Sequence, residues 1–226
     1  MTNDISGIAR RRFLAGASAI AVLALTGCES LPALSLTEAI RRLLDRAARN
    51  AFVRLMAPGG FWDNQLARLD LPEVFGRRGN VLQSILTSPL FRSRLQRELN
   101  HLAEDGARSA APIVADAVRT IGIANARALI QGGPTAATAF LRDAMAGQLI
   151  EVMVPALGDA MRVTRDPLVR EALAALTGVD VSGAARLLAV EADAAIWGEI
   201  GREESAIRAN PDATGDPVLI GVFRVG

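Results

Sequence analysis

The chain has 226 residues, half of them hydrophobic, with 25 basic and 24 acidic side chains, one histidine and one cysteine, which is typical of a folded domain with a sizeable core. A single cysteine excludes a disulfide framework and multi-cysteine metal sites, and a single histidine excludes two-histidine metal motifs, so we expect no metal and no cofactor. The net charge of +1 gives no reason to expect nucleic acid as a partner.

The first 27 residues have the pattern of an export signal. Polar and small residues precede three arginines and an apolar run over residues 13–25, which is too short to span a bilayer core that needs about 20 residues. The twin-arginine pattern is matched by Arg10, Arg11, Phe13 and Leu14. We therefore expect residues 1–27 to be a signal peptide. The general secretion route is the alternative, since it also accepts basic signals.

Residues 25–28, with the sequence LTGC, resemble a bacterial lipobox, whose cysteine is lipidated and becomes the first residue of the mature chain. The chain's only cysteine, Cys28, stands where this motif requires a thiol. Because several acyl chains on one cysteine anchor a protein stably, we expect attachment to a membrane without a spanning segment. Residues 28–34 would form the lipidated tether. Glu29, in place of an Asp that would indicate inner-membrane retention, favours the outer membrane of the cell envelope, facing the periplasm.

Residues 35–226 are predicted to form one all-α domain, a single irregular helical bundle of about seven or eight helices. Capping residues, prolines and glycines divide the chain, and no segment alternates with the period of a strand. Helices are expected over residues 36–55, 72–87, 88–102, 110–120, 182–209 and 218–223, with a short one ending at 132–133. A longer helix should begin at residue 134 and be kinked or interrupted at Pro155, and another should begin at Asp166-Pro167.

Arginines share one face of the first predicted helix, namely Arg42, Arg46 and Arg49, with Arg54 a turn further on. This face would lie close to the lipid anchor, and an arginine near an anionic surface contributes about 1 kcal/mol. Contact with anionic lipids through Arg42, Arg46 and Arg49 is therefore one hypothesis. A solvated face is the alternative, and pairing with the acidic last helix is another.

Carboxylates crowd the last long helix, at Glu191, Asp193, Glu199, Glu203 and Glu204. Glu199 and Glu203 are one turn apart, so they could form an acid/base pair if burial separated their pKa values. A solvated outer face explains them as well. Glu98 and His101 have the spacing of a di-iron ligand pair, but the second pair that such a site needs is missing, so we expect a surface histidine.

Three separated blocks of sequence stand out along the chain. The first block is GGFWDN at residues 59–64 followed by LP at 71–72. The second is LIQGGPTAAT at 129–138, with Phe140 and Arg142. The third is EE at 203–204, then Ile207, Arg208 and NP at 210–211. Together, and in the same order, these blocks resemble an uncharacterised bacterial family, domain of unknown function 4197, and the resemblance covers about residues 35–223. It implies a helical envelope protein, often with a lipoprotein signal, and supplies no activity.

The three blocks could share a ligand or partner site, and we expect them to meet in space. The candidate residues are Asp63, Asn64, Thr135, Thr138, Glu203, Glu204, Arg208 and Asn210. The alternative is structural. The segment GGP at 132–134 makes a tight turn, a threonine hydroxyl satisfies free N–H groups at a helix start, Glu204 pairs with Arg208, and NP at 210–211 ends a helix.

We therefore expect a membrane-anchored lipoprotein of the cell envelope, whose helical module has a non-catalytic binding or structural role. The sequence does not identify a protein partner. A carrier of an apolar ligand such as a lipid is the first alternative, and a largely apolar pocket of about 300–1,000 Å³ would support it. An enzyme that uses the carboxylates of the last helix is the second, which would need Glu199 or Glu203 to converge with Asp63 and an arginine in one cleft.

Overall fold

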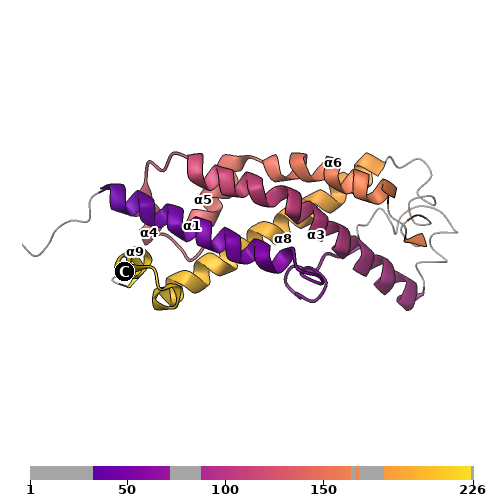
Figure 1. The fold of residues 1–226 in the computed structure, drawn as a ribbon, viewed down its shortest axis with the longest axis horizontal. Helices are drawn as coiled ribbons and strands as arrows, with labels where there is room; N and C mark the ends of the chain where they lie inside the picture. The colour runs from indigo at the N-terminus through magenta and orange to yellow at the C-terminus, as the bar shows by residue number, and fades with distance from the viewer. Residues whose placement is uncertain (1–32, 72–87, 164–165, 168–169, 171–180, 225–226) are drawn as a thin grey trace, which may run out of the picture. The chain divides into compact units, whose positions relative to one another are not determined.

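The computed structural model describes residues 33–71, 88–163, 166–167, 170 and 181–224, and every regular element among them is helical (Figure 1). The all-α prediction is therefore confirmed. Residues 33–226 form one compact unit. The predicted signal, the Cys28 lipobox and the predicted helix over 72–87 lie outside the described residues. Within the described part of the chain, no helix has both the length and the apolar character to cross a membrane.

Four long helices build the core: α1 (Ala33–Leu55), α3 (Pro89–Thr120), α6 (Gln148–Val163) and α8 (Val181–Ala209). Helices α1 and α6 each pack against both α3 and α8, so the four form a closed bundle (Figure 1). Apolar side chains recur on each helix at intervals of three and four, and fully buried examples are Leu43, Leu95, Leu157 and Ile196. Many of the other buried residues are alanines, which let the helix axes approach closely.

Shorter helices lie near the start of α1 and the end of α8: α4 (Ala126–Gln131), α5 (Ala136–Met145), the 3-10 helix η2 (Pro211–Thr214) and α9 (Pro217–Phe223). Helix α5 packs on α8, while α4 and α9 both pack on α1 (Figure 1). The predicted ends of α1, α4 and α8 and the predicted C-terminal helix all agree with the structure within a few residues.

The prediction of two helices between residues 88 and 120 is wrong, because α3 is one continuous helix that includes Gly106 and Pro112. Its buried stripe continues through the segment where the sequence suggests a break, at Ala103, Ala107 and Ala110. Gly106 faces Leu157 of α6, and a Cβ at this position would lie 3.3 Å from a Leu157 methyl group. Close packing against α6 therefore offsets the low helix propensity of glycine and proline here.

The predicted interruption at Pro155 is also misplaced. Helix α6 runs through Pro155, and the break falls at Ala146 and Gly147, which both have positive φ angles, of 46° and 82°. The Ala146 N–H bonds the Arg142 and Asp143 carbonyls and ends α5 as a left-handed cap. A proline inside a helix removes one hydrogen bond and crowds the carbonyl four residues earlier, which a bend can accommodate, whereas a left-handed residue ends the helix.

Candidate functional site

A network of charged and amide side chains joins α8 to α1 and to the loop that follows α1. At its centre is Glu199, which is only 3% exposed. Its Oε1 accepts hydrogen bonds from Arg54 Nε at 2.9 Å and Nη2 at 2.6 Å, and its Oε2 accepts one from Asn64 Nδ2 at 3.1 Å. Arg202 forms a further ion pair with Glu199. We call this group the Glu199 network.

Glu203, one turn further along α8, belongs to the same network. Its Oε2 accepts a hydrogen bond from Asn50 Nδ2 at 2.7 Å, and its Oε1 accepts one from Arg54. Arg54 therefore bridges the two glutamates, so they do not form the isolated carboxylate pair that acid/base chemistry needs. Burial, with the positive charge of Arg54 nearby, lowers the pKa of Arg202.

A second network, centred on the fully buried Glu204, lies on another side of α8. Glu204 Oε1 accepts the backbone N–H of Ala137 at 3.0 Å, and Oε2 accepts that of Thr138 at 2.6 Å. These are N–H groups in the first turn of α5, which have no partner within their own helix. The negative charge also lies where the helix dipole favours it.

Arg208 completes the Glu204 network. Its Nε donates to Glu204 Oε1 at 2.8 Å, while Nη1 and Nη2 donate to the carbonyls of Ile130 at 2.9 Å and Leu129 at 2.8 Å, near the end of α4. The guanidinium also stacks over the Phe223 ring, 4.8 Å from its centroid. One ion pair of α8 therefore binds the end of α4 and the start of α5.

The threonines of the second block do not cap α5 as the sequence predicts. Thr135 occupies the N-cap position but its side chain makes no cap hydrogen bond. Thr138 is buried, and its hydroxyl has no partner within the described residues. The Glu204 carboxylate takes the free N–H groups instead, which leaves the weaker hydroxyl acceptors unused. The start of α5 lies so close to α8 that a Cβ at Gly201 would lie 3.2 Å from Thr135 Cγ2.

The glycines of the first block lie in a turn that α3 holds in place. Gly59 has a φ angle of 79°, and its N–H donates to Glu104 Oε1 at 2.9 Å. Gly60 lies against the end of α1, where a Cβ would be 2.5 Å from the Leu55 carbonyl oxygen. Asp63 in the same turn is exposed and joins neither network through its side chain.

Two buried polar residues of α3 were missed in the sequence, Asn100 and Glu104. Asn100 accepts the Leu69 N–H at 2.8 Å and donates to the Leu69 carbonyl at 3.0 Å. It therefore satisfies both backbone groups of Leu69 and holds the loop after α1 against α3. Both residues lie on the face that carries the buried leucines of α3. A polar residue on such an apolar face indicates a buried hydrogen-bonding side chain, and this pattern could have predicted both. His101 is exposed, as expected, with Nδ1 3.3 Å from Glu104 Oε1.

The three blocks therefore converge on the second half of α8, but in two networks rather than one. The first block reaches it through Asn64, and the second through the backbone of Ala137 and Thr138. Exposed Asn210 makes no side-chain cap at η2, and its N–H bonds the Ala206 carbonyl at 3.0 Å. Asp63, Thr135 and Asn210 have no side-chain role in either network.

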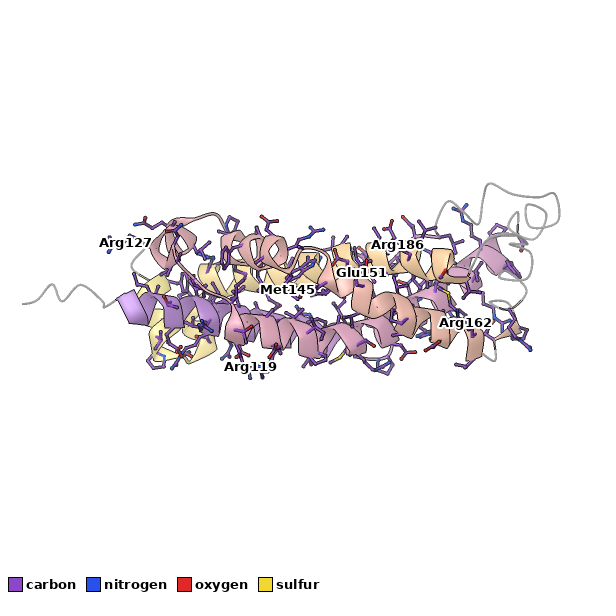
Figure 2. All side chains as sticks on the ribbon, turned by 90° about the horizontal axis from the view of Figure 1, so that it is seen from above. Arg119, Arg127, Met145, Glu151, Arg162 and Arg186 are labelled. Carbon is purple, nitrogen blue, oxygen red and sulfur yellow. The ribbon has the colours of Figure 1, made fainter. Side chains whose placement is uncertain are left out.

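Asp193 is a further buried carboxylate of α8. Its Oδ1 accepts the Trp197 indole N–H at 2.9 Å, and its Oδ2 lies 3.4 Å from Arg142 of α5. Burial raises the pKa of Asp193 despite these two contacts. On the molecular surface, Glu151 of α6 and Arg186 of α8 form an exposed ion pair at 3.1 Å (Figure 2). Among the described residues, no group of three metal-ligating side chains could hold a metal ion.

This arrangement defines an all-α bundle whose loops and short helices are held by charged side chains of the long helices. The family described as Protein of unknown function (DUF4197) matches residues 30–224, so the chain belongs to that family. No curated protein and no solved structure matches the chain. The family resemblance that the three blocks indicate is therefore confirmed over nearly the whole chain.

Proposed function

We propose that the protein is a membrane-anchored lipoprotein of the cell envelope whose helical domain has a binding or structural role and no catalytic one. One observation carries the proposal. The buried carboxylates among the described residues each bind an arginine, an indole N–H or a backbone N–H of the fold itself, namely Glu104, Asp193, Glu199 and Glu204. A catalytic acid or base must reach a substrate, whereas these groups hold the protein's own elements together.

The sequence supports the anchor. Cys28 ends a lipobox-like segment after a twin-arginine-like signal, and the proposed mature chain begins there with a short tether. Because α1 already begins at Ala33, an extended tether of residues 28–32 would span at most about 18 Å, so the helical domain would stay close to the membrane. We propose the periplasmic face of the outer membrane as its location.

Separation of the cell's membranes on a density gradient tests this anchoring. Wild-type protein should sediment with the outer membrane. Cys28→Ala should accumulate as an uncleaved precursor, because the lipoprotein peptidase acts only after the cysteine is lipidated. Ser30→Ala is the matched control, since it leaves residues 25–28 unchanged. Wild-type protein in the soluble periplasmic fraction would overturn the anchor, and a Cys28→Ala chain of mature size would overturn the assigned lipidation site.

We also propose that the arginine face of α1 contacts anionic lipid headgroups. Arg42 forms ion pairs with Glu38 at 2.8 Å and Asp216 at 3.2 Å, and Arg49 pairs with Asp45. Arg46 has no ion-pair partner within the described part of the chain. Surface ion pairs contribute little to stability and exchange readily, so all three arginines remain candidates and Arg46 is the foremost one.

A second candidate function, the binding of an apolar ligand, is favoured by one specific observation. A groove of about 300 Å³ with a mainly apolar lining runs between α1 and α3. Its size is at the lower end of the range for small-molecule sites. The groove is open to solvent along one side, so a ligand would lie between two helices rather than inside the bundle.

A further inference from the structure

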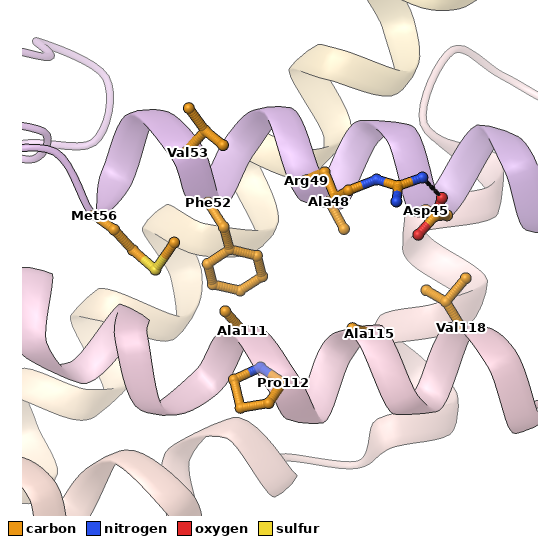
Figure 3. Close-up of a pocket in the computed structure, with 10 residues that line it drawn as sticks. All are labelled: Asp45, Ala48, Arg49, Phe52, Val53, Met56, Ala111, Pro112, Ala115 and Val118. Carbon is orange, nitrogen blue, oxygen red and sulfur yellow. Dashed lines mark hydrogen bonds and ion pairs between the residues drawn. The ribbon is translucent and has the colours of Figure 1, made fainter.

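The apolar groove exists because small side chains of both helices, Ala48 of α1 and Ala111 and Ala115 of α3, leave space between the helices (Figure 3). Phe52 and Met56 of α1 and Pro112 and Val118 of α3 add larger apolar surface to its walls. Phe52 is buried and Ala115 is exposed, so the groove runs from the edge of the core to the surface. Such a cleft exposes apolar surface to water, and filling it with hydrocarbon would be favourable.

One end of the apolar groove is charged. Asp45 and Arg49, which form an ion pair on α1, lie at this end (Figure 3). A second groove, of about 620 Å³ and lined mostly by charged residues, shares these two residues and Val53 with the first and continues around α1 past Arg42 and Arg46. The two grooves therefore meet along the exposed side of α1, with hydrocarbon on one side and guanidinium groups on the other.

The acids that line the polar groove are already engaged. Glu38 and Asp216 both pair with Arg42, and Asp45 pairs with Arg49. Asp216 is further committed because its carboxylate accepts the Val218 N–H at 2.9 Å at the start of α9. Arg46 also lines this groove and has no carboxylate partner among the described residues. Its positive charge is therefore available to a bound anion.

From this juxtaposition we infer that the α1–α3 groove binds a single-chain anionic amphiphile, a fatty-acid anion, with its carboxylate at Arg46 and its hydrocarbon chain along Phe52 and Met56. The inference rests on the second candidate function and names its ligand class. A volume of about 300 Å³ suits one hydrocarbon chain rather than the paired chains of a bilayer phospholipid. An arginine binds a carboxylate through two parallel hydrogen bonds, which selects an acid over the corresponding alcohol.

Calorimetric titration of the domain tests the inference. A chain of residues 33–226 contains every described core residue and forms a compact unit by itself, so it is suitable for the titration. Dodecanoate and dodecanol, each below its solubility and micelle limits, are the probes. We expect one molecule of dodecanoate to bind per chain, with at least about tenfold higher affinity than dodecanol, since a charged hydrogen-bonded pair typically adds that much.

Two substitutions separate the hydrocarbon contact from the charge contact. Ala115→Phe fills the groove and should lower the affinity for both probes by about tenfold or more. Ala139→Phe, at an exposed position of α5, should leave both affinities unchanged. Arg46→Gln should remove the preference for dodecanoate and leave dodecanol binding unchanged. Arg127→Gln, an exposed arginine of α4, is its control. Unchanged circular dichroism would show that each variant keeps its fold.

Each other outcome overturns a defined part of the account. No binding of either probe would overturn both the fatty-acid assignment and the second candidate function. Equal binding of both probes, insensitive to Arg46→Gln, would overturn the fatty-acid assignment and leave apolar-ligand binding in place. A dimer in sedimentation that Ala115→Phe dissociates would show that a second copy of the chain, and not an amphiphile, occupies the groove.

Discussion

The Glu204 carboxylate and the Arg208 guanidinium lie 2.8 Å apart on successive turns of α8, and between them they bind the start of α5 and the end of α4. An arginine also binds a backbone carbonyl at the end of α3, where Arg41 of α1 donates to the Ile121 carbonyl at 2.9 Å. Charged side chains of the long helices thus satisfy the backbone groups that helix ends leave free. The hydrogen bonds that a capping residue would make are supplied here by a different helix.

Arg208→Met should lower the free energy of unfolding by about 3 kcal/mol, because it leaves the buried Glu204 charge without its cation. Methionine keeps most of the side-chain volume that packs on Phe223. Denaturant unfolding measures the change. Arg119→Met is the control, since Arg119 pairs with Asp116 on the exposed surface and should change stability by less than about 0.5 kcal/mol. Equal effects of the two variants would contradict the structural role of the Glu204 network.

Gly60→Ala and Gly198→Ala should change the free energy of unfolding in opposite directions. A Cβ at Gly60 would meet backbone carbonyl oxygens at the end of α1, so the turn must shift and stability should fall by about 2 kcal/mol. Gly198 lies within α8 with nothing near a new Cβ, and alanine there should raise stability by about 0.5–1 kcal/mol. Thermal unfolding compares them. A neutral Gly60→Ala would show that the first block does not need a close backbone approach.

The sequence predicts the pairing of Glu204 with Arg208 because residues four apart face each other on a helix. It does not predict that the pair binds α4 and α5, since those partners are more than sixty residues away along the chain. Local rules therefore assign the cap to Thr135 or Thr138, although tertiary contacts place a stronger acceptor there. Asn100 and Glu104 are missed for the same reason, because their partners lie in a loop without periodicity.

The helices themselves follow from the sequence where local signals and packing agree. The ends of α8 and α4 coincide with Asn210 and Gly132, which stop helices by their backbone preferences. The continuous α3 is not predicted, because its middle has weak helix formers and gains its stability from contact with α6. The break at Ala146 is not predicted either, since alanine rarely adopts a positive φ angle.

Asp193→Asn should change how stability depends on pH. The raised pKa of Asp193 means that the folded state binds a proton more tightly than the unfolded state. Stability of the wild type should therefore fall as the pH rises from the usual Asp value, about 4, through the raised one. Asparagine at this position still accepts the Trp197 N–H, but it does not ionise, so the variant should not lose stability as the pH rises. Urea unfolding between pH 4 and 7 should show the variant gaining relative to the wild type; a difference independent of pH would contradict the assignment.

Vesicle binding tests the contact between the arginine face of α1 and anionic lipid. The domain of residues 33–226 should bind anionic vesicles weakly and neutral ones not at all, and 1 M salt should abolish binding because the Debye length falls to about 3 Å. Joint replacement of Arg42, Arg46 and Arg49 by Gln should lower binding with little change in melting temperature, since the acids of α8 pair with Arg54 instead. Equal binding to neutral vesicles would contradict the contact.

Mass spectrometry of the N-terminal fragment of the protein, recovered from native membranes, is the most direct test of the proposed lipoprotein. The account predicts that the mature chain begins at Cys28 and that this cysteine carries the added mass of its acyl chains. A mature chain with an unmodified thiol at Cys28, or a chain that retains residues 1–27, would contradict it.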